Sequence, residues 1–69
     1  MRVMDPVKIG RRLKELRGVW LTQAKLAEEI GTTPAAISNY EQGIRIPSDE
    51  HKIKLANYFG VTVQELFFD

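Results

Sequence analysis

The stretch QAKLAEEIGTTPAAISNYEQG, residues 23–43, contains two helical patterns on either side of a short turn. Thr22 can cap the first helix, and Gly31 can end it in a left-handed conformation. Thr33 and Pro34 combine an N-cap with a proline at the first helical position, so a second helix is predicted to begin at Pro34. Only the three residues GTT separate the two helices, which favours a sharp crossing over antiparallel packing.

Three further start signals flank this stretch. Asp5 followed by Pro6 predicts one helix, and Ser48 before two acidic residues predicts another. Thr62 with Glu65 three residues later is a capping box. Apolar residues recur every three or four positions after each signal. The sequence therefore predicts an all-α fold of five helices, at about residues 6–17, 23–30, 34–41, 49–59 and 63–68.

Length and composition limit the function classes. A chain of 69 residues has room for one domain over residues 1–69 and little space for an internal cavity. It has no cysteine, and one histidine, His51, cannot form a zinc site alone. No paired nucleophile and base, phosphate-binding glycine loop or metal cluster is evident. We therefore expect no enzyme, no cofactor, no metal and no small-molecule substrate.

The charge is unevenly distributed although the formal net charge is only +1. Residues 1–31 hold seven basic side chains against four acidic ones, while residues 32–69 hold three against five. This basic half permits contact with phosphates without requiring it. The N-terminal segment lacks the apolar core of a signal peptide, and no window reaches the roughly 20 apolar residues of a membrane span. A cytoplasmic protein is expected.

The helix predicted at 34–41 has an outward face of unusually short side chains. Ile37 and Tyr40 are expected to point into the core, and Ala27 must be small where the two helices cross. Small residues allow a helix to approach another surface closely. The side chains left facing outward are Thr33, Pro34, Ala35, Ala36, Ser38 and Asn39.

The segment at 23–43 resembles the helix-turn-helix of phage repressors and Cro-type proteins, also called xenobiotic-response-element regulators. IGRRLKELR resembles the first helix of that family, and GIRIPS and LANYFGVTVQELF resemble its later loop and closing helices. The resemblance covers residues 7–67. It implies a compact five-helix bundle of the lambda-repressor-like type, with the motif at 22–41 and double-stranded DNA as the partner.

The resemblance implies that helix 34–41 enters the DNA major groove with its outward face at the base edges. Asn39 can pair bidentately with adenine, and the small apolar side chains can pack on thymine methyls. An A·T-containing half-site read partly through DNA shape is expected. The implied phosphate contacts are Gln23, Gln42, Gly43 and Arg45, with ordinary solvated side chains as the alternative reading of Gln23 and Arg45.

The resemblance also implies a structural ion pair between Arg17 and Glu41. Trp20 stands just before the leucine, where glycine is common in the family, and is interpreted as a lid on the core rather than as a group that stacks on a base. Lys52 occupies a position that is usually a core leucine. Either Ile53 replaces it after a rotation of the helix, which we favour, or the lysine stem covers the core while its ammonium group reaches water.

The leading functional hypothesis is a sequence-specific transcriptional regulator, a repressor by analogy with most of the family, that binds a pseudo-palindromic operator as a homodimer. Leu66, Phe67 and Phe68 are candidate dimer contacts, because two adjacent phenylalanines on a short last helix are not expected to be both buried in one small domain. The alternative is that one packs inward and the other is simply exposed. The competing hypothesis is a protein-interaction module, antitoxin-like or a co-activator, built on the same fold.

Overall fold

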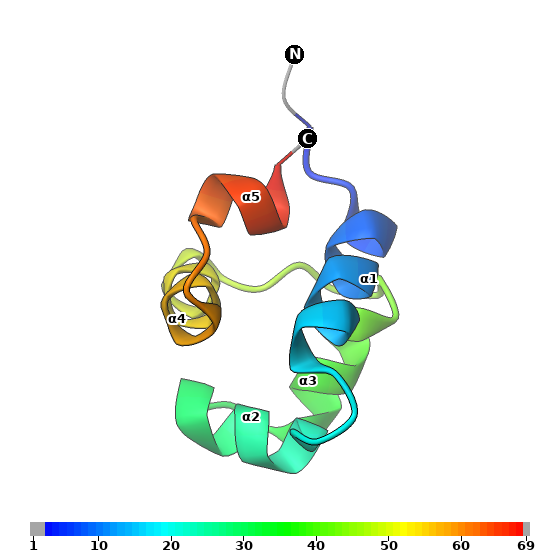
Figure 1. The fold of residues 1–69 in the computed structure, drawn as a ribbon. Coiled ribbons are helices and arrows are strands. Elements are labelled where there is room, and N and C mark those ends of the chain that lie inside the picture. The colour runs from blue at the N-terminus through cyan, green and yellow to red at the C-terminus, as the bar shows by residue number, and fades with distance from the viewer. Residues whose placement is uncertain (1–2, 69) are drawn as a thin grey trace.

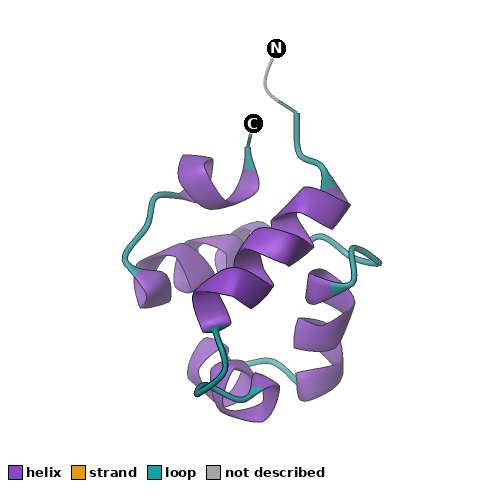
Figure 2. Ribbon diagram, turned by 45° about the vertical axis from the view of Figure 1, so that its right-hand side comes forward, coloured by secondary structure: helices purple, strands orange, loops and turns teal. Residues whose placement is uncertain are grey.

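The computed structural model describes residues 3–68, and this range contains five α-helices and no strand (Figures 1 and 2). They are α1 (Pro6–Arg17), α2 (Gln23–Ile30), α3 (Pro34–Glu41), α4 (Asp49–Phe59) and α5 (Val63–Phe67). The predicted all-α architecture and the five helix starts are confirmed. Only the last boundary differs, because Phe68 already has an extended backbone, with φ −122° and ψ 144°.

Each helix begins at the side chain that the sequence marks as its cap. The Asp5 carboxylate accepts hydrogen bonds from the backbone N–H groups of Val7 and Lys8, at 3.0 and 3.3 Å. In each of the other four helices a hydroxyl accepts the N–H of the third residue along. These caps satisfy N–H groups that have no partner inside the helix. The capping hydroxyls belong to Thr22, Thr33, Ser48 and Thr62.

The core lies where α1, α2 and α3 meet, and α4 and α5 close it (Figure 1). Leu13, Leu26, Ile37 and Phe67 have no exposed surface, and Tyr40 is 1% exposed. Burial of each such side chain contributes about 1.5–3 kcal/mol. The core therefore fixes α3 from behind and leaves its other face free.

Gly10 allows α1 and α3 to come close together, and the sequence analysis assigned it no role. A Cβ built on Gly10 would overlap the backbone oxygens of Tyr40 and Glu41 at the end of α3. The sequence does offer a hint of this close contact, because glycine is ordinarily unfavourable inside a helix and its presence there often has a packing reason. This contact positions the end of α3 that carries Glu41.

The preferred interpretation of α4 is wrong. Lys52 is 9% exposed and Ile53 is 53% exposed, so the helix is not rotated to bring Ile53 inward. The lysine stem covers the core instead, while Nζ lies 3.2 Å from Oδ1 of Asp49 at the surface. A flexible aliphatic stem with a charged tip can satisfy both environments, so no rotation is needed.

The interpretation of Trp20 as a core lid is also wrong, because its side chain is 94% exposed. Leu21, the next residue, is half-buried and packs against the core. Arg17 donates from Nη1 to the Leu21 carbonyl at 2.8 Å, which draws the chain inward at Leu21. Leu21, and not Trp20, therefore covers the core at this end of α1.

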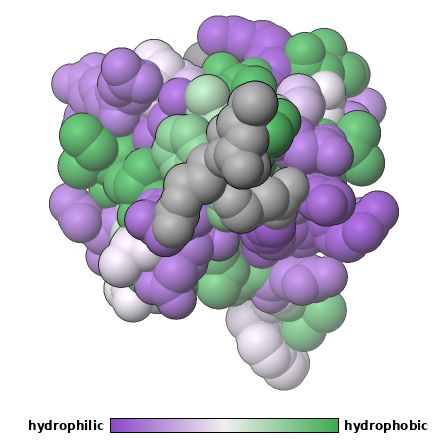
Figure 3. Space-filling model, turned by 90° about the horizontal axis from the view of Figure 1, so that it is seen from above, coloured by the Kyte–Doolittle hydropathy of each residue, from purple (hydrophilic) through white to green (hydrophobic). Residues whose placement is uncertain are grey.

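The dimer contact proposed for the C-terminal segment does not hold for Leu66 and Phe67. Their side chains are 1% and 0% exposed, because α5 lays them against α1 and α4. Phe68 is half-buried against the same core. The view from above shows apolar patches interrupted by polar residues (Figure 3). Of the three residues, only Phe68 retains surface for another molecule.

Candidate DNA-binding surface

The turn between α2 and α3 is tightly closed. Gly31 has φ 81° and ψ 37°, a left-handed conformation that suits glycine. The N–H groups of Gly31 and Thr32 both donate to the Ala27 carbonyl at 2.9 Å. The Thr33 hydroxyl then accepts the N–H of Ala36 at 3.1 Å. These bonds fix the direction in which α3 leaves the turn.

The outward face of α3 is smaller than the sequence predicted. Thr33, Pro34 and Ala35 are exposed, and Ser38 and Asn39 are partly exposed. Ala36 is only 7% exposed and belongs to the core, so its prediction as a base contact is wrong. It lies beside Ile37 on the face that packs against the other helices. An eight-residue helix that packs on both α1 and α2 leaves only a narrow strip to solvent.

Asn39 combines a fixed backbone with an available amide. Its carbonyl accepts the N–H groups of Ile44 and Arg45, at 2.9 and 3.3 Å. Within residues 3–68 its side-chain amide makes no hydrogen bond. An amide of this kind offers one acceptor and two donor hydrogens to an external partner. It is the one such group well inside the exposed strip of α3.

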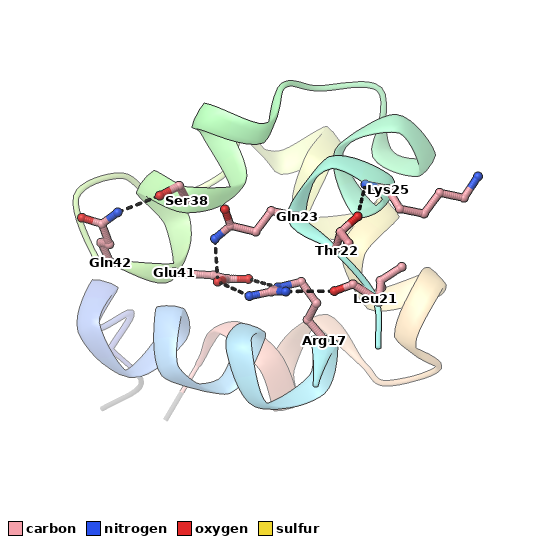
Figure 4. Close-up of polar contacts among 8 residues, drawn as sticks. All are labelled: Arg17, Leu21, Thr22, Gln23, Lys25, Ser38, Glu41 and Gln42. Carbon is pink, nitrogen blue, oxygen red and sulfur yellow. Dashed lines mark hydrogen bonds and ion pairs between the residues drawn. The ribbon is translucent and has the colours of Figure 1, made fainter. Parts of the chain in front are cut away.

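Ser38 and Gln42 are joined on the same side of α3. Gln42 donates from Nε2 to the Ser38 hydroxyl at 2.7 Å (Figure 4). The spacing of four residues brings the two side chains onto one face. The serine proton and the glutamine carbonyl oxygen are left for outside partners. These two side chains therefore act as one polar unit near the end of α3.

Arg17, Glu41 and Gln23 form a polar centre between α1, α3 and the start of α2 (Figure 4). Arg17 donates from Nε to Oε2 of Glu41 at 2.6 Å and from Nη2 to Oε1 at 3.0 Å. The two side chains are 15% and 4% exposed. Hydrogen bonding to Glu41 raises the pKa of Arg17 above its ordinary value. The predicted contact between these two residues is present.

The same centre holds Gln23, which the sequence analysis connected only with phosphate. Gln23 donates from Nε2 to Oε1 of Glu41 at 3.0 Å. A carboxylate only accepts hydrogen bonds, so the nitrogen of the amide must face Glu41. The second N–H and the carbonyl oxygen remain available. Gln23 is also the first residue of α2, where backbone N–H groups favour an anion.

The loop after α3 places Arg45 beside the helix end. Gly43 has φ 78°, and a Cβ there would lie 3.1 Å from Val7. The Arg45 guanidinium lies 5.8 Å from the ring centroid of Tyr40 and is exposed. Cation–π contact of this kind restrains the guanidinium while leaving its N–H groups free to bind. Gln23, through its bond to Glu41, and Arg45, beside Tyr40, thus both lie near the C-terminal end of α3.

Metal and membrane features are lacking in the part of the chain that the structure describes. Residues 3–68 contain no group of three or more His, Asp or Glu side chains that could hold a metal ion. None of the helices formed by these residues combines the length and the apolar character needed to cross a membrane.

Comparisons with known proteins agree on one family. The sequence model of the family described as "Helix-turn-helix" matches residues 13–66. Over 61 residues, or 87% of this chain, the sequence is 34% identical to the cryptic phage CTXphi transcriptional repressor RstR of Vibrio cholerae. It is 36% identical over an equal length to the HTH-type transcriptional activator BcrR of Enterococcus faecalis. These matches span 54% and 30% of the two relatives' own lengths.

A solved structure supports the same assignment. The P22 c2 repressor protein, crystallised with a synthetic operator, superposes with a TM-score of 0.81 at 25% identity. The match covers 86% of this chain and 91% of that one. Most of this chain therefore shares the fold of that repressor.

Proposed function

Because this chain belongs to the helix-turn-helix family, we propose that it is a sequence-specific regulator of transcription that binds double-stranded DNA. The observation that carries the proposal is the exposed strip of α3, with short side chains at its start and the available amide of Asn39 further along. α3 enters the major groove, and the small residues let its backbone approach the base edges.

Asn39 reads an adenine, and the ring of Pro34 and the methyl of Ala35 pack on thymine methyl groups. The half-site therefore contains A·T pairs. Ala36 is buried and takes no part. Since few hydrogen bonds reach the bases, DNA shape and deformability contribute to discrimination.

The phosphates on either side of the groove are bound by residues that flank the C-terminal end of the strip. Gln23 presents its second amide N–H and the α2 N-terminus to one strand, and Glu41 holds that amide in place. Gln42, Arg45 and the backbone near Gly43 contact the other side. These contacts set the register of α3 without reading the sequence.

The protein acts as a homodimer on a pseudo-palindromic operator, because two α3 helices about 34 Å apart fit successive major-groove turns on one face of DNA. Its dimer surface excludes the buried side chains of Leu66 and Phe67. It works in the cytoplasm, and we assign it no catalytic step.

We further propose that the regulator is a repressor. RstR and the P22 c2 protein are repressors, whereas BcrR is an activator, so the direction of control depends on where the operator lies relative to the promoter. A reporter carrying the selected operator across its promoter tests this point. Expression should fall when the protein is present, and a rise would make it an activator.

The decisive experiment is selection of random double-stranded DNA by the purified protein at near-physiological salt, with Asn39→Ala in parallel. The expected product is an inverted repeat with A·T-containing half-sites. Asn39→Ala should relax the preference at one base pair per half-site, with a loss of about 1–3 kcal/mol. The matched control is Asn57→Ala, since Asn57 is an exposed asparagine on α4.

A half-site made only of G·C pairs would contradict the assignment of Asn39. If no DNA sequence is enriched at any salt concentration, the result would favour a protein-interaction module, which does not need to neutralise phosphates.

A further inference from the structure

The loop between α1 and α2 exposes the only tryptophan of the chain. Trp20 is 94% exposed and the preceding Val19 is 89% exposed, although both are large and apolar. Tryptophan is among the residues that contribute most to binding when an interface covers them. An indole with almost no contact in its own domain is therefore a candidate for contact with another molecule.

The loop holds Trp20 in place from both sides. On one side, the N–H of Gly18 donates to the Lys14 carbonyl at 3.0 Å. On the other, Arg17 donates to the Leu21 carbonyl at 2.8 Å, and Leu21 packs against the core. The exposed indole is thus carried by a short, anchored segment, which lowers the entropy lost when it binds.

Arg17, which binds the loop through the Leu21 carbonyl, also holds the residues of the proposed phosphate contact. The Arg17 guanidinium binds both the Leu21 carbonyl and Glu41, and Glu41 holds the amide of Gln23. Figure 4 shows these groups around one centre. Trp20 is three residues before Gln23 in the chain, so the exposed loop leads directly into the segment proposed to bind phosphate.

The charge of this segment favours DNA over a second copy of this chain as the partner that Trp20 contacts. Residues 8–25 hold six basic side chains and one acidic one, and the segment stays basic after the pairing of Arg17 with Glu41 and of Lys25 with Glu28 and Glu29. A two-fold symmetric contact places the same patch of each copy against itself, which would bring two basic segments together. The phosphates of DNA are instead complementary to this segment.

We propose, resting on the regulator function above, that Trp20 packs against the sugar–phosphate backbone beside the groove that α3 enters. The indole face covers a deoxyribose, and its Nε1–H donates to a phosphate oxygen. Contacts of this kind strengthen binding without reading bases. Trp20→Ala should therefore weaken binding about tenfold, on operator and unrelated DNA alike.

Two features should not change in this variant. The base preference should stay the same, and so should the slope of affinity against salt, because the indole carries no charge and displaces no counterion. The stability of the free protein should also be unchanged, since the side chain has almost no contacts to lose. Tyr58→Ala, which truncates an exposed aromatic on α4, is the matched control and should leave affinity unchanged.

The test is one titration with two readouts, using the labelled duplex recovered by selection and a scrambled duplex. Anisotropy of the label reports binding, and tryptophan emission with acrylamide quenching reports Trp20 alone. The expected result is a rise in anisotropy with Trp20 becoming protected from acrylamide. A rise in anisotropy with unchanged quenching overturns the Trp20 contact and leaves the regulator function standing.

Two other outcomes also overturn the proposal. If anisotropy does not rise with either duplex, the regulator function fails and the Trp20 contact fails with it. If quenching of Trp20 falls as protein concentration rises without DNA, the indole meets a second copy of the chain.

Discussion

Gln23 and Glu41 are joined by a hydrogen bond of 3.0 Å between Nε2 and Oε1, and this bond connects the start of α2 to the end of α3. The same carboxylate receives two hydrogen bonds from Arg17 on α1. The side chain proposed to bind phosphate is thus oriented by a nearly buried ion pair. Core stability and the proposed phosphate contact thus depend on one carboxylate.

Gln23 can be changed in two ways that separate these roles. Gln23→Ala removes one hydrogen bond but leaves the pair intact, so the free energy of unfolding should fall by only about 0.5–1.5 kcal/mol. Gln23→Glu places a second carboxylate beside Glu41 and should be more destabilising at neutral pH. Both should weaken DNA binding. Urea unfolding measures the loss of stability, and DNA titration measures the loss of affinity. Equal stability of the two variants would contradict the close approach of Gln23 to the Glu41 carboxylate.

Arg17→Ala should be far more damaging. Its partner Glu41 is 4% exposed and would remain charged without compensation. We expect the free energy of unfolding to fall by about 3–5 kcal/mol, as measured by urea denaturation. Lys25→Ala is the control, because Lys25 pairs with Glu28 and Glu29 at the surface and should show no measurable loss. Similar losses in both variants would argue against a structural role for the Arg17 pair.

The sequence predicted the helices well because their ends are local chemistry. A capping hydroxyl, a proline at the first position and a glycine after the last turn act within a few residues, so Thr33, Pro34 and Gly31 suffice to place the turn. The contact of Arg17 with Glu41 followed from the family resemblance, since the two lie 24 positions apart in the sequence.

Burial was harder to predict, because it depends on how neighbouring helices rotate and fill space. Lys52 is buried through its stem, Trp20 is displaced by Leu21, and Ala36 turns inward beside Ile37. Polarity and size indicate the opposite for Lys52 and Trp20, while Ala36 was assigned to the outward face of its helix. The hydrogen bond from Gln23 to Glu41 likewise requires α2 and α3 in their final positions.

Gly10 gives a direct test of the close contact between α1 and α3. Alanine inside a helix ordinarily stabilises by about 0.5–1 kcal/mol relative to glycine. Here the new Cβ would overlap the backbone oxygens of Tyr40 and Glu41, so Gly10→Ala should instead destabilise by at least about 2 kcal/mol.

Gly18→Ala is the control for Gly10. A Cβ at Gly18 meets no atom within 4 Å, but its φ of 66° is unfavourable for alanine. With ψ −155° its backbone lies in a region essentially restricted to glycine, so the cost should be about 1–3 kcal/mol and purely conformational. Thermal unfolding of both variants would decide the point, and a stabilising Gly10→Ala would rule out the tight crossing.

Lys52 and Ile53 test the orientation of α4. Lys52→Leu should change the free energy of unfolding by less than about 1.5 kcal/mol, because leucine fills the space of the buried stem. Lys52→Ala should cost more than Ile53→Ala, although the sequence suggests the reverse, since Lys52 is 9% and Ile53 53% exposed. Urea denaturation of the three variants gives the order. A larger loss from Ile53→Ala would show that the helix is rotated.

The capping box of α5 should make stability depend on pH. Glu65 accepts the N–H of Thr62 at 3.0 Å, and this backbone hydrogen bond lowers the pKa of Glu65. A carboxyl whose pKa is lower in the folded state stabilises that state above its unfolded pKa. The stabilisation is lost as the pH falls through the folded pKa. Because α5 carries Leu66 and Phe67 into the core, loosening its first turn should lower the melting temperature.

Glu65→Gln isolates this effect from the other carboxyl groups. The glutamine oxygen can still accept the Thr62 N–H, but it has no proton to gain. The melting temperature of the native protein minus that of Glu65→Gln should be positive near pH 6 and should shrink towards about pH 3, below the ordinary glutamate pKa of about 4.3. A difference that stays constant over this range would show that the Thr62 hydrogen bond does not depend on the charge of Glu65.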